Sequence, residues 1–499
     1  MAQCRHCSAL GPRRPCAASN AAEACSGTIP FMPVTTEGPV MLPESLLRQF
    51  DAPGPRYTSY PTADRFVEDF GGTQLQQALQ QRAQGDIGAA ALPLSVYVHI
   101  PFCASVCYYC ACNKVITRHH ERAAEYLDAL EQEITGVVAH TRSGQPVSQL
   151  HFGGGSPTFL SDAELARVVG SLRGAFVIDA KTEMSIEVDP RTVTPARLAH
   201  CRALGFNRIS FGVQDFDPQV QQAVHRVQPY ESVRGLMSAA RQLGFKSINA
   251  DLIYGLPRQT PQSFAHTVQQ IGELRPDRIA LYAYAHLPQR FKPQRRIVAA
   301  ELPSAGQRVA MLGGAIAGFV GRGYQYIGMD HFALPDDALA VAKRQGRLHR
   351  NFQGYSTQPD CDLIGLGVSA IGRIGACYYQ NAKTLPEYYD ALRQGRLPVQ
   401  RGIALTRDDV LRRAVIMALM CQGRVEFESI ELAHLIRMRE YFARELQALR
   451  PMAEAGLVEI EPDAIQVTAA GWYLVRAVAM VFDRWLQDSA QHERFSRIV

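Results

Sequence analysis

Cys103-Ala-Ser-Val-Cys107-Tyr-Tyr-Cys110-Ala-Cys112 is the stretch that decides the fold, and it directly follows a short apolar run at 95–100. An iron–sulfur cube normally takes four cysteine thiolates. Three thiols spaced four and three residues apart supply three of them and leave one iron open. An open iron can hold the amino and carboxylate groups of S-adenosylmethionine, so the motif predicts radical chemistry started by that cofactor.

Two other interpretations of the cysteine stretch stay open at this point. A structural zinc site usually joins two distant pairs of ligands, and Cys112 is cramped as a fourth ligand only two residues after Cys110. The second alternative is that these cysteines are buried free thiols that bind no metal. A chain of this length without a signal peptide is expected in a reducing compartment, and we expect the cytoplasm.

Strands and helices alternate outward from this stretch. Apolar runs separated by amphipathic segments predict six βα units, which implies a parallel sheet with right-handed crossovers. Helix-start signals support the assignment: Ser161 with Glu164 forms a capping box, and Thr194-Pro195 and Thr260-Pro261 are N-cap pairs, with Gly205 ending the helix that begins at Thr194. The predicted strands lie near 95–100, 148–152, 184–189, 208–214, 247–253 and 278–285.

One face of each middle strand is polar. Parallel strands that are buried on both faces usually read as continuous apolar runs. The pattern favours a barrel whose helices cover the apolar side and whose lumen holds a polar ligand, over an open sheet with a bare face. The polar-face residues are Ser185, Glu187, Asp189, Arg208, Ser210, Gly212, Gln214, Ser247, Asn249 and Asp251.

Two further features suit a nucleoside ligand. The run 153–157, Gly-Gly-Gly-Ser-Pro, follows the second predicted strand, where glycines let the backbone approach a ligand closely. Glu187 lies on the polar face of the third strand, and a carboxylate there suits the hydroxyls of a ribose. The simpler interpretation of the glycine run is a turn, and that of Glu187 is a salt bridge within the lumen.

Length and composition set the remaining limits. A chain of 499 residues predicts two or three domains. The net charge of +5 is spread along the chain, so we expect no nucleic-acid partner, and no apolar run is long enough to predict a membrane span. We expect a monomer.

The domain organisation expected from composition has five parts. Residues 1–40 lack any helical or strand period, so we expect a disordered leader, with translation starting near Met32 or Met41. Residues 41–90 form an N-terminal segment, and the barrel occupies 91–300. Residues 301–400 extend the barrel as a mixture of helix and loop. Residues 401–499 read as helix, hairpin and helix, like a winged-helix module with a packing or lid role.

With these residues in view, the chain resembles the oxygen-independent coproporphyrinogen III oxidases of the radical S-adenosylmethionine superfamily over about residues 45–499. The most specific segments are Arg56-Tyr-Thr-Ser-Tyr-Pro-Thr62 and the CxxxCxxCxC form of the cysteine stretch. Where the family commonly has Thr, this chain has Ser156, which keeps the hydroxyl. The resemblance implies a partial (β/α)6 radical-SAM barrel with an N-terminal segment and a mainly helical, winged-helix-like C-terminal domain.

The resemblance also implies a reaction and its cofactors. Two propionates of coproporphyrinogen III lose CO2 and become vinyl groups, with a [4Fe-4S] cluster and two S-adenosylmethionine molecules per chain. The cluster ligands would be Cys103, Cys107 and Cys110, with Cys112 a neighbour that is not a ligand. The implied contacts to the first S-adenosylmethionine are Tyr97, Gly154, Glu187 and Ile371. The implied contacts to the second are Tyr109, Gly155, Ser156, Gln214, Arg226, Asp251 and Ala285.

A substrate with four propionates needs cations, and Arg pairs best with carboxylates. The candidates are Arg56, Lys114, Arg226 and Arg350. The alternative for each is a solvated charge on the surface with no role in binding. An electron donor is required, but the residues do not identify it. A haem-binding chaperone related to these oxidases and a radical enzyme with another substrate remain as alternatives. Cys112 and the segment 56–62 count against the chaperone.

Overall fold

The computed structural model describes residues 46, 49–50, 52–85, 93–142, 144–358 and 361–487, all within one compact unit. The expected leader at 1–40 lies outside these residues. Among the described residues, no helix combines the length and the apolar character that crossing a bilayer requires.

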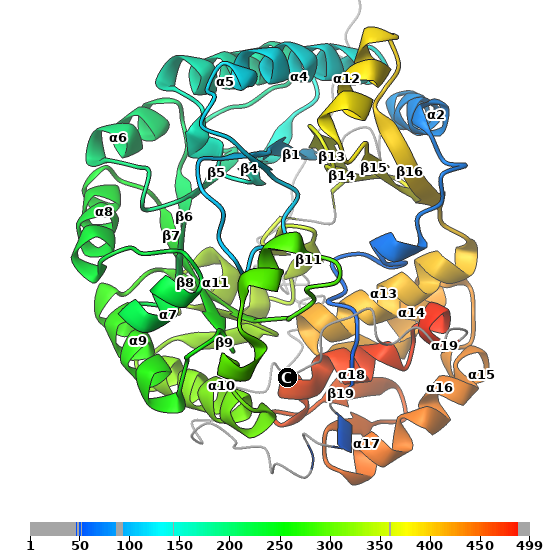
Figure 1. Cartoon of the computed structure of the whole chain (residues 1–499). Helices are drawn as coiled ribbons and strands as arrows, with labels where there is room; N and C mark the ends of the chain where they lie inside the picture. Colours follow the sequence, from blue (N-terminus) through cyan, green and yellow to red (C-terminus); the bar gives the residue numbers. More distant parts are fainter. Residues whose placement is uncertain are drawn as a thin grey trace, which may run out of the picture. The chain divides into compact units, whose positions relative to one another are not determined.

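The central element is a twelve-stranded sheet that is parallel through its middle (Figure 1). The six predicted strands are confirmed as β1 (Leu94–Ile100), β4 (Val147–Gly154), β5 (Glu183–Val188), β6 (Arg208–Gln214), β7 (Ser247–Tyr254) and β8 (Arg278–Ala283). They pair in chain order, and each pair is parallel. The strand order runs from β16 to β9 without closing on itself, so the barrel is partial, as the resemblance implied.

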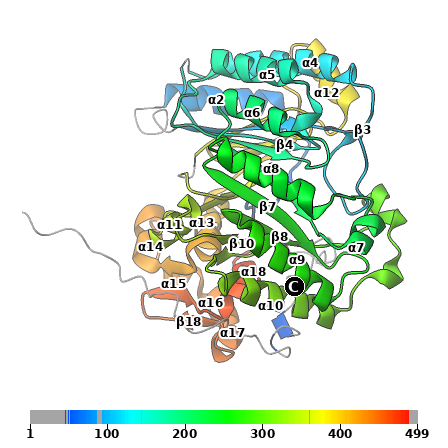
Figure 2. The ribbon, with the colours of Figure 1, turned by 90° about the vertical axis from the view of Figure 1, so that its left-hand side faces the viewer.

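Helices on the outer side of the sheet cover its apolar face (Figures 1 and 2). They are α4 (Arg122–Val138), α5 (Asp162–Ala175), α6 (Pro195–Ala203), α8 (Tyr230–Gln242) and α9 (Pro261–Leu274). Side chains of their buried stripes and of the strands, such as Leu127, Leu165 and Ile186, join in one hydrophobic core. The polar residues of each strand therefore face the concave side.

The predicted helix starts are confirmed. The Ser161 side chain accepts a hydrogen bond from the Glu164 N–H, and the Glu164 carboxylate accepts one from the Ser161 N–H. Thr194 and Thr260 cap α6 and α9 through their side chains, with proline next in each helix. Gly205, with φ at +102°, follows the last turn of α6.

The expectation of helix and loop at 301–400 was wrong in its main feature, because most of the strands that extend the sheet lie there. A seventh parallel strand, β13 (Leu363–Leu366), pairs with β1 on the side opposite β4. Its partners in β1 lie more than 260 residues earlier in the chain, so no local pattern marks this parallel pairing. The other elements of this region are β9 (Gln325–Gly328), β10 (His331–Ala333), β11 (His349–Asn351), β12 (Gly354–Ser356), β14 (Ile371–Ile374), β15 (Cys377–Asn381), the first residues of β16 (Val399–Ala404), α10 (Ala305–Val320), α11 (Ala338–Arg344) and α12 (Leu385–Arg393).

The C-terminal part is helical with a small sheet, as expected for a winged-helix-like module. A hairpin of β18 (Val458–Ile460) and β19 (Ala464–Val467) pairs with β17 (Arg424–Glu426). The helices form much of a second hydrophobic core, to which Tyr57, Tyr60 and Ile327 also belong. The helices are α13 (Arg407–Gln422), α14 (Phe427–His434), α15 (Met438–Tyr441), α16 (Ala443–Ala448), α17 (Arg450–Glu454), α18 (Val475–Met480) and α19 (Arg484–Gln487).

The N-terminal segment is tied to the C-terminal helices. The Tyr57 hydroxyl donates to Asp483 at 3.0 Å, and the Arg65 guanidinium donates to the Trp485 carbonyl at 2.8 Å. The segment continues through η1 (Ala63–Arg65) to α2 (Gly72–Gln84), which lies beside the strands β14 and β16. Residues from both ends of the chain thus pack together.

A buried carboxyl joins α4 to the added strands. Glu133 accepts hydrogen bonds from the Gly367 N–H at 2.7 Å, the Asn381 amide at 2.5 Å and the Tyr388 hydroxyl at 2.6 Å. Burial outweighs these donors and raises the pKa of Glu133 to about 7. The loop after β13 depends on this carboxyl, because Gly367 begins that loop.

This raised pKa gives a test of stability. The native state holds the Glu133 proton more tightly than the unfolded chain does, so this contribution is complete below the unfolded pKa and is lost as the pH rises through about 7. Glu133→Gln cannot ionise. The free energy of unfolding of the variant minus that of the unaltered protein should rise by about 1–3 kcal/mol from pH 5 to pH 8. Thermal unfolding of both proteins across this range checks it, and a pH-independent difference would contradict it.

Candidate active site

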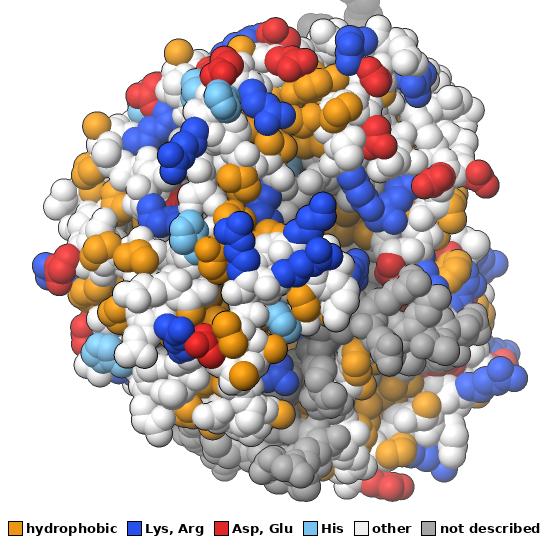
Figure 3. All heavy atoms as spheres, viewed as in Figure 1, with side chains coloured by type: hydrophobic (Ala, Val, Ile, Leu, Met, Phe, Trp, Pro, Cys, Tyr) orange, Lys and Arg blue, Asp and Glu red, His pale blue; other side chains and the backbone are white. Residues whose placement is uncertain are grey.

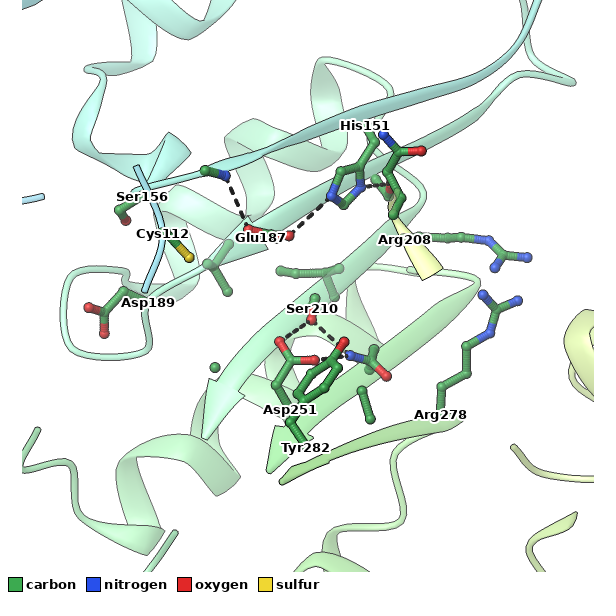
Figure 4. A pocket seen from close by; sticks show the side chains of 18 of the residues that line it. Cys112, His151, Ser156, Glu187, Asp189, Arg208, Ser210, Asp251, Arg278 and Tyr282 are labelled. Atoms are coloured by element: carbon green, nitrogen blue, oxygen red, sulfur yellow. Dashed lines mark hydrogen bonds and ion pairs between the residues drawn. The ribbon is translucent and has the colours of Figure 1, made fainter. Parts of the chain in front are cut away.

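A cavity of about 410 Å³ occupies the concave side of the sheet (Figure 4). Its lining runs from the cysteine loop at the carboxyl ends of the strands to Ser95, Arg208 and Arg278 at their amino ends. All ten polar-face residues predicted from the alternation line it. The prediction of a polar lumen is therefore confirmed.

The cysteine loop is held at both ends by a short parallel pairing of β2 (Phe102–Cys103) with β3 (Val115–Ile116). Phe102 anchors it, because its ring is fully buried between Tyr126 and Phe159. Cys103, Cys107, Cys110 and Cys112 all line the cavity. Among the described residues, no three His, Cys, Asp or Glu side chains are placed to hold a single metal ion.

The electrostatics around the thiols suit a group that carries positive iron. Burial, together with the nearby Cys110 and Cys107 thiolates, raises the pKa of Cys103 to about 12. The hydrogen bond from Cys112 is the largest effect on Cys110 and, against burial and with help from Lys114, lowers its pKa to about 6. Three cysteine sulfurs in one cavity, which would repel one another as thiolates, fit an iron–sulfur cluster, whose irons would relieve that repulsion.

Two guanidinium groups also face the loop. Arg191 donates to the Cys107 sulfur at 3.4 Å, and Arg226 donates to the same sulfur at 3.5 Å. Both also pair with Asp189, at 2.6 Å and 3.3 Å respectively. Burial opposes the charge of Asp189, but these arginines outweigh it and lower its pKa.

The glycines after β4 form a close-fitting cradle. Gly154 has φ at +117°, and a Cβ on it would meet the His99 ring at 2.7 Å. A Cβ on Gly155 would meet the Pro101 carbonyl oxygen at 2.6 Å. Only glycine fits at these two positions, and the backbone there is open to a ligand in the lumen.

Glu187 lies opposite the cradle and is held by a histidine (Figure 4). The His151 ring contacts the Glu187 carboxylate at 3.2 Å and Ser185 Oγ at 2.5 Å, and its face stacks on Tyr97. Burial opposes ionisation of Glu187. The contacts with His151 and with the Gly154 N–H, at 3.3 Å, outweigh it and lower the pKa.

Asp251 behaves in the opposite way. It accepts hydrogen bonds from Ser210 and from Asn249, each at 2.8 Å. Burial, and then the negative charge of Glu187, raise its pKa to about 6. Glu187 is thus kept charged, while Asp251 takes up a proton more readily than an ordinary aspartate, so the two carboxyls differ in character toward a polar ligand.

Most of the predicted site residues meet at this cavity. Three of the predicted cofactor contacts do not line it: Tyr97 lies behind His151, Ile371 packs near Tyr378 at the start of β14, and Ala285 uses its carbonyl to accept from Gln294 at 3.2 Å. The predicted residues that do line it are Cys103, Cys107, Tyr109, Cys110, Gly154, Gly155, Ser156, Glu187, Gln214, Arg226 and Asp251.

Two of the four candidate cations line the main cavity and two do not. Lys114 and Arg226 line the main cavity. Arg350 lines a small adjoining cavity and its guanidinium lies over the Tyr355 ring at 4.7 Å. Arg56 forms an ion pair with Asp330 and lies over the Tyr282 ring at 5.1 Å.

Several lining residues were missed by the sequence reading. His151 shares a face with Gln149 on β4, and Arg278 shares one with Ala280 and Tyr282 on β8. The alternation that identified the middle strands would have found them on these two strands. Arg191 lies in a loop, where no period marks it.

Comparison with known proteins agrees with this geometry. The family description "Radical SAM superfamily" matches residues 97–271, and "HemN C-terminal domain" matches residues 405–474. An oxygen-independent coproporphyrinogen III oxidase from Escherichia coli (strain K12) is 50% identical over 455 residues, covering 91% of this chain and 98% of that protein. The protein of the same name from Pseudomonas aeruginosa is also 50% identical, over 456 residues.

A solved structure is similar over nearly its whole length. The coproporphyrinogen III oxidase (HemN) from Escherichia coli, described as a radical SAM enzyme, superposes with a TM-score of 0.84. It is 50% identical in sequence, and the match covers 89% of this chain and 99% of that one.

The glycine cradle gives a prediction with an internal control. Gly155→Ala forces a Cβ against a backbone oxygen, so it should lower the thermal unfolding midpoint by a few degrees, as overpacking usually costs about 1–3 kcal/mol. Gly170→Ala in α5 is the control, because a Cβ there meets no atom within 4 Å. It should leave the midpoint equal or higher. Equal midpoints for the two variants would show that the cradle is not tight.

Proposed function

Because this chain belongs to the oxygen-independent coproporphyrinogen III oxidases of the radical SAM superfamily, we propose that Cys103, Cys107 and Cys110 are the residues that hold its [4Fe-4S] cluster. The chain oxidises coproporphyrinogen III without oxygen, as an enzyme of porphyrin and haem biosynthesis. Its cofactors are the cluster and S-adenosylmethionine.

The single observation that supports the ligand assignment best is that the three thiols share one lumen with the glycine cradle and Glu187. Cys112 lines the same cavity, and its hydrogen bond to Cys110 suits a neighbour rather than a ligand. When bound, the cluster and S-adenosylmethionine supply a 5′-deoxyadenosyl radical, which takes a hydrogen atom from the β-carbon of a propionate. Loss of CO2 and of one electron, which a one-electron acceptor takes up, would then leave a vinyl group on that arm.

The chain's own residues would bind and orient the cofactor. Gly154 presents backbone groups to the methionine end, and Glu187, kept charged by His151, accepts from the ribose hydroxyls. Tyr97 supports His151 from behind, and Ile371 is proposed as a further contact on the first molecule.

We assign a second S-adenosylmethionine to the other side of the lumen. Asp251, whose pKa is raised to about 6, would accept hydrogen bonds there and takes up a proton more readily than an ordinary aspartate. Arg226 is held close to Cys107 and Asp189, where its charge suits a carboxylate. The residues assigned to the second molecule are Tyr109, Gly155, Ser156, Gln214, Arg226, Asp251 and Ala285.

We also propose the role of each segment of the chain, its location and its source of electrons. We assign the barrel to residues 91–300, its extension to 301–400, the C-terminal module to 401–499 and a substrate-covering role to 41–90. The N-terminal segment supports that role, because Arg56 lies over Tyr282, which lines the lumen. We propose a cytoplasmic monomer served by a separate electron donor.

The test is anaerobic turnover. Protein purified without oxygen should carry a brown cluster and form protoporphyrinogen IX from coproporphyrinogen III when it is given S-adenosylmethionine and dithionite. Cys103→Ser, Cys107→Ser and Cys110→Ser should each lose the cluster absorbance and at least about 99% of activity. Cys112→Ser is the matched control and should keep the cluster.

Two outcomes would contradict the proposal. An intact cluster with stoichiometric haem binding and no vinyl product would favour the haem-binding chaperone. Loss of the cluster in Cys112→Ser would make that residue a ligand.

A further inference from the structure

The amino-terminal end of the lumen carries a pair of arginines that no role above uses. Arg208 begins β6 and Arg278 begins β8, and both line the cavity. Figure 4 shows the two guanidinium groups at the same end of the pocket, turned toward each other. Burial and the neighbouring Arg278 charge lower the pKa of Arg208 to about 10, so the two groups repel each other.

Each arginine is only partly satisfied by the protein. Arg208 pairs with Glu183 at 3.1 Å, and Arg278 pairs with Asp337 at 2.8 Å. One terminal nitrogen of each, Nη1 of Arg208 and Nη2 of Arg278, is buried without a hydrogen-bond partner. Buried donors of this kind are costly unless something accepts from them.

A purely structural ion-pair network explains this less well. In such a network the terminal guanidinium nitrogens would donate to the carboxylates of the network. Here one terminal nitrogen of each arginine stays unpaired, and the two positively charged groups lie at the same end of a cavity. An anion between them would accept from both and remove their repulsion. A carboxylate suits this best, since its two oxygens match the fork of donors on a guanidinium.

We infer that Arg208 and Arg278 form a subsite for the carboxylate of a propionate that the reaction leaves intact. This inference rests on the proposed function, which brings a substrate with four propionates into the lumen. β6 runs from Arg208 to Gln214, about 20 Å at 3.3 Å per residue. The arms that react must reach the cofactor end, so an arm at the opposite end is a retained one.

Binding of two porphyrins to the anaerobic holoenzyme tests the inference. Coproporphyrin III carries four propionates, and protoporphyrin IX carries only the two retained ones. Arg208→Gln and Arg278→Gln should each weaken the binding of both porphyrins about tenfold, the effect of losing one charge-assisted pair. With coproporphyrinogen III, KM should rise by a similar factor while kcat changes little.

Glu183→Gln is the matched control, because it breaks the Arg208 ion pair and keeps the guanidinium. It should leave porphyrin affinity within about twofold, whereas a purely structural role would make it as damaging as Arg208→Gln. Unchanged affinity of the arginine variants for both porphyrins would overturn the subsite. Loss confined to coproporphyrin III would overturn the assignment to a retained arm. S-adenosylmethionine cleavage with dithionite alone should persist in all variants, and its loss in the unaltered enzyme would point instead to failure of the proposed function.

A second observation, on the surface, carries a separate inference. Arg290, Lys292, Arg295, Arg296 and Lys383 are exposed and form what we term the loop-side basic patch. Figure 3 shows Lys and Arg side chains gathered near the middle of this face. Burial, and then the charges of Arg401 and Arg290, lower the pKa of Lys383, which places it among other cations.

The loop-side basic patch contacts the cysteine loop directly. Gln294, within the short helix η3 (Lys292–Arg296), donates to the Tyr109 carbonyl at 3.0 Å. The Arg296 guanidinium lies over the Tyr108 ring at 5.2 Å, and Asn113 donates to the Lys383 carbonyl at 2.9 Å. A protein bound on these cations would therefore lie next to the cluster.

We propose that the loop-side basic patch docks an acidic one-electron carrier protein, which is oxidised by one electron as the cluster is reduced. Charge complementarity of this kind speeds association and weakens with salt.

Reduced flavodoxin, an acidic flavoprotein, serves as the probe. Lys292→Glu combined with Arg295→Glu should slow flavodoxin-driven turnover at least about tenfold at low ionic strength, and the difference should shrink at high salt. Dithionite-driven turnover should not change, and Arg450→Glu, an exposed charge in α17, is the matched control. Equal flavodoxin-driven rates in all three proteins would overturn this docking site, and a loss with dithionite as well would show a structural effect instead.

Discussion

The alternation of side chains along the parallel strands is the constraint on which the rest of the structure depends. Each strand from β4 to β8 places its apolar residues under the outer helices and its polar residues in the lumen. A one-residue shift in register would exchange these faces and bury the charges in the core. The same pattern therefore holds the sheet in place and builds the site.

Charge in the lumen is tolerated because nearly every group has a partner. Glu187 is held by His151, and Asp189 by Arg191 and Arg226. Among the lining groups that lack a partner, the terminal nitrogens of Arg208 and Arg278 lie at the same end of the cavity, and there the structure points to a ligand. The distribution of unpaired donors is therefore as informative as the contacts themselves.

The two ends of the lumen are assembled in different ways. The cysteine end is local: one strand, one turn and one loop carry all four thiols. The arginine end draws on residues from β5 to β8 and on Asp337, the residue just before α11. This difference explains why the cysteine loop was evident in the sequence and the Arg208–Arg278 pair was not.

Much of the fold could be predicted from residues 95–285, because their strands and helices alternate and carry clear caps at Ser161, Thr194 and Thr260. Residues 301–400 could not be read in the same way. Their strands are only three to six residues long, and β13 pairs with the distant β1. Tyr97, Ile371 and Ala285 were taken from the resemblance, and they lie off the lumen surface in this structure.

By itself the sequence determined the family, the cysteine loop and which face of each middle strand is polar, because spacing and alternation are local properties. Only the tertiary structure decided that β13 completes the parallel sheet, that His151 holds Glu187, and that two arginines meet at the far end of the cavity. These depend on the curvature of the sheet and on contacts between residues far apart in the chain, and neither leaves a periodic signal in the sequence.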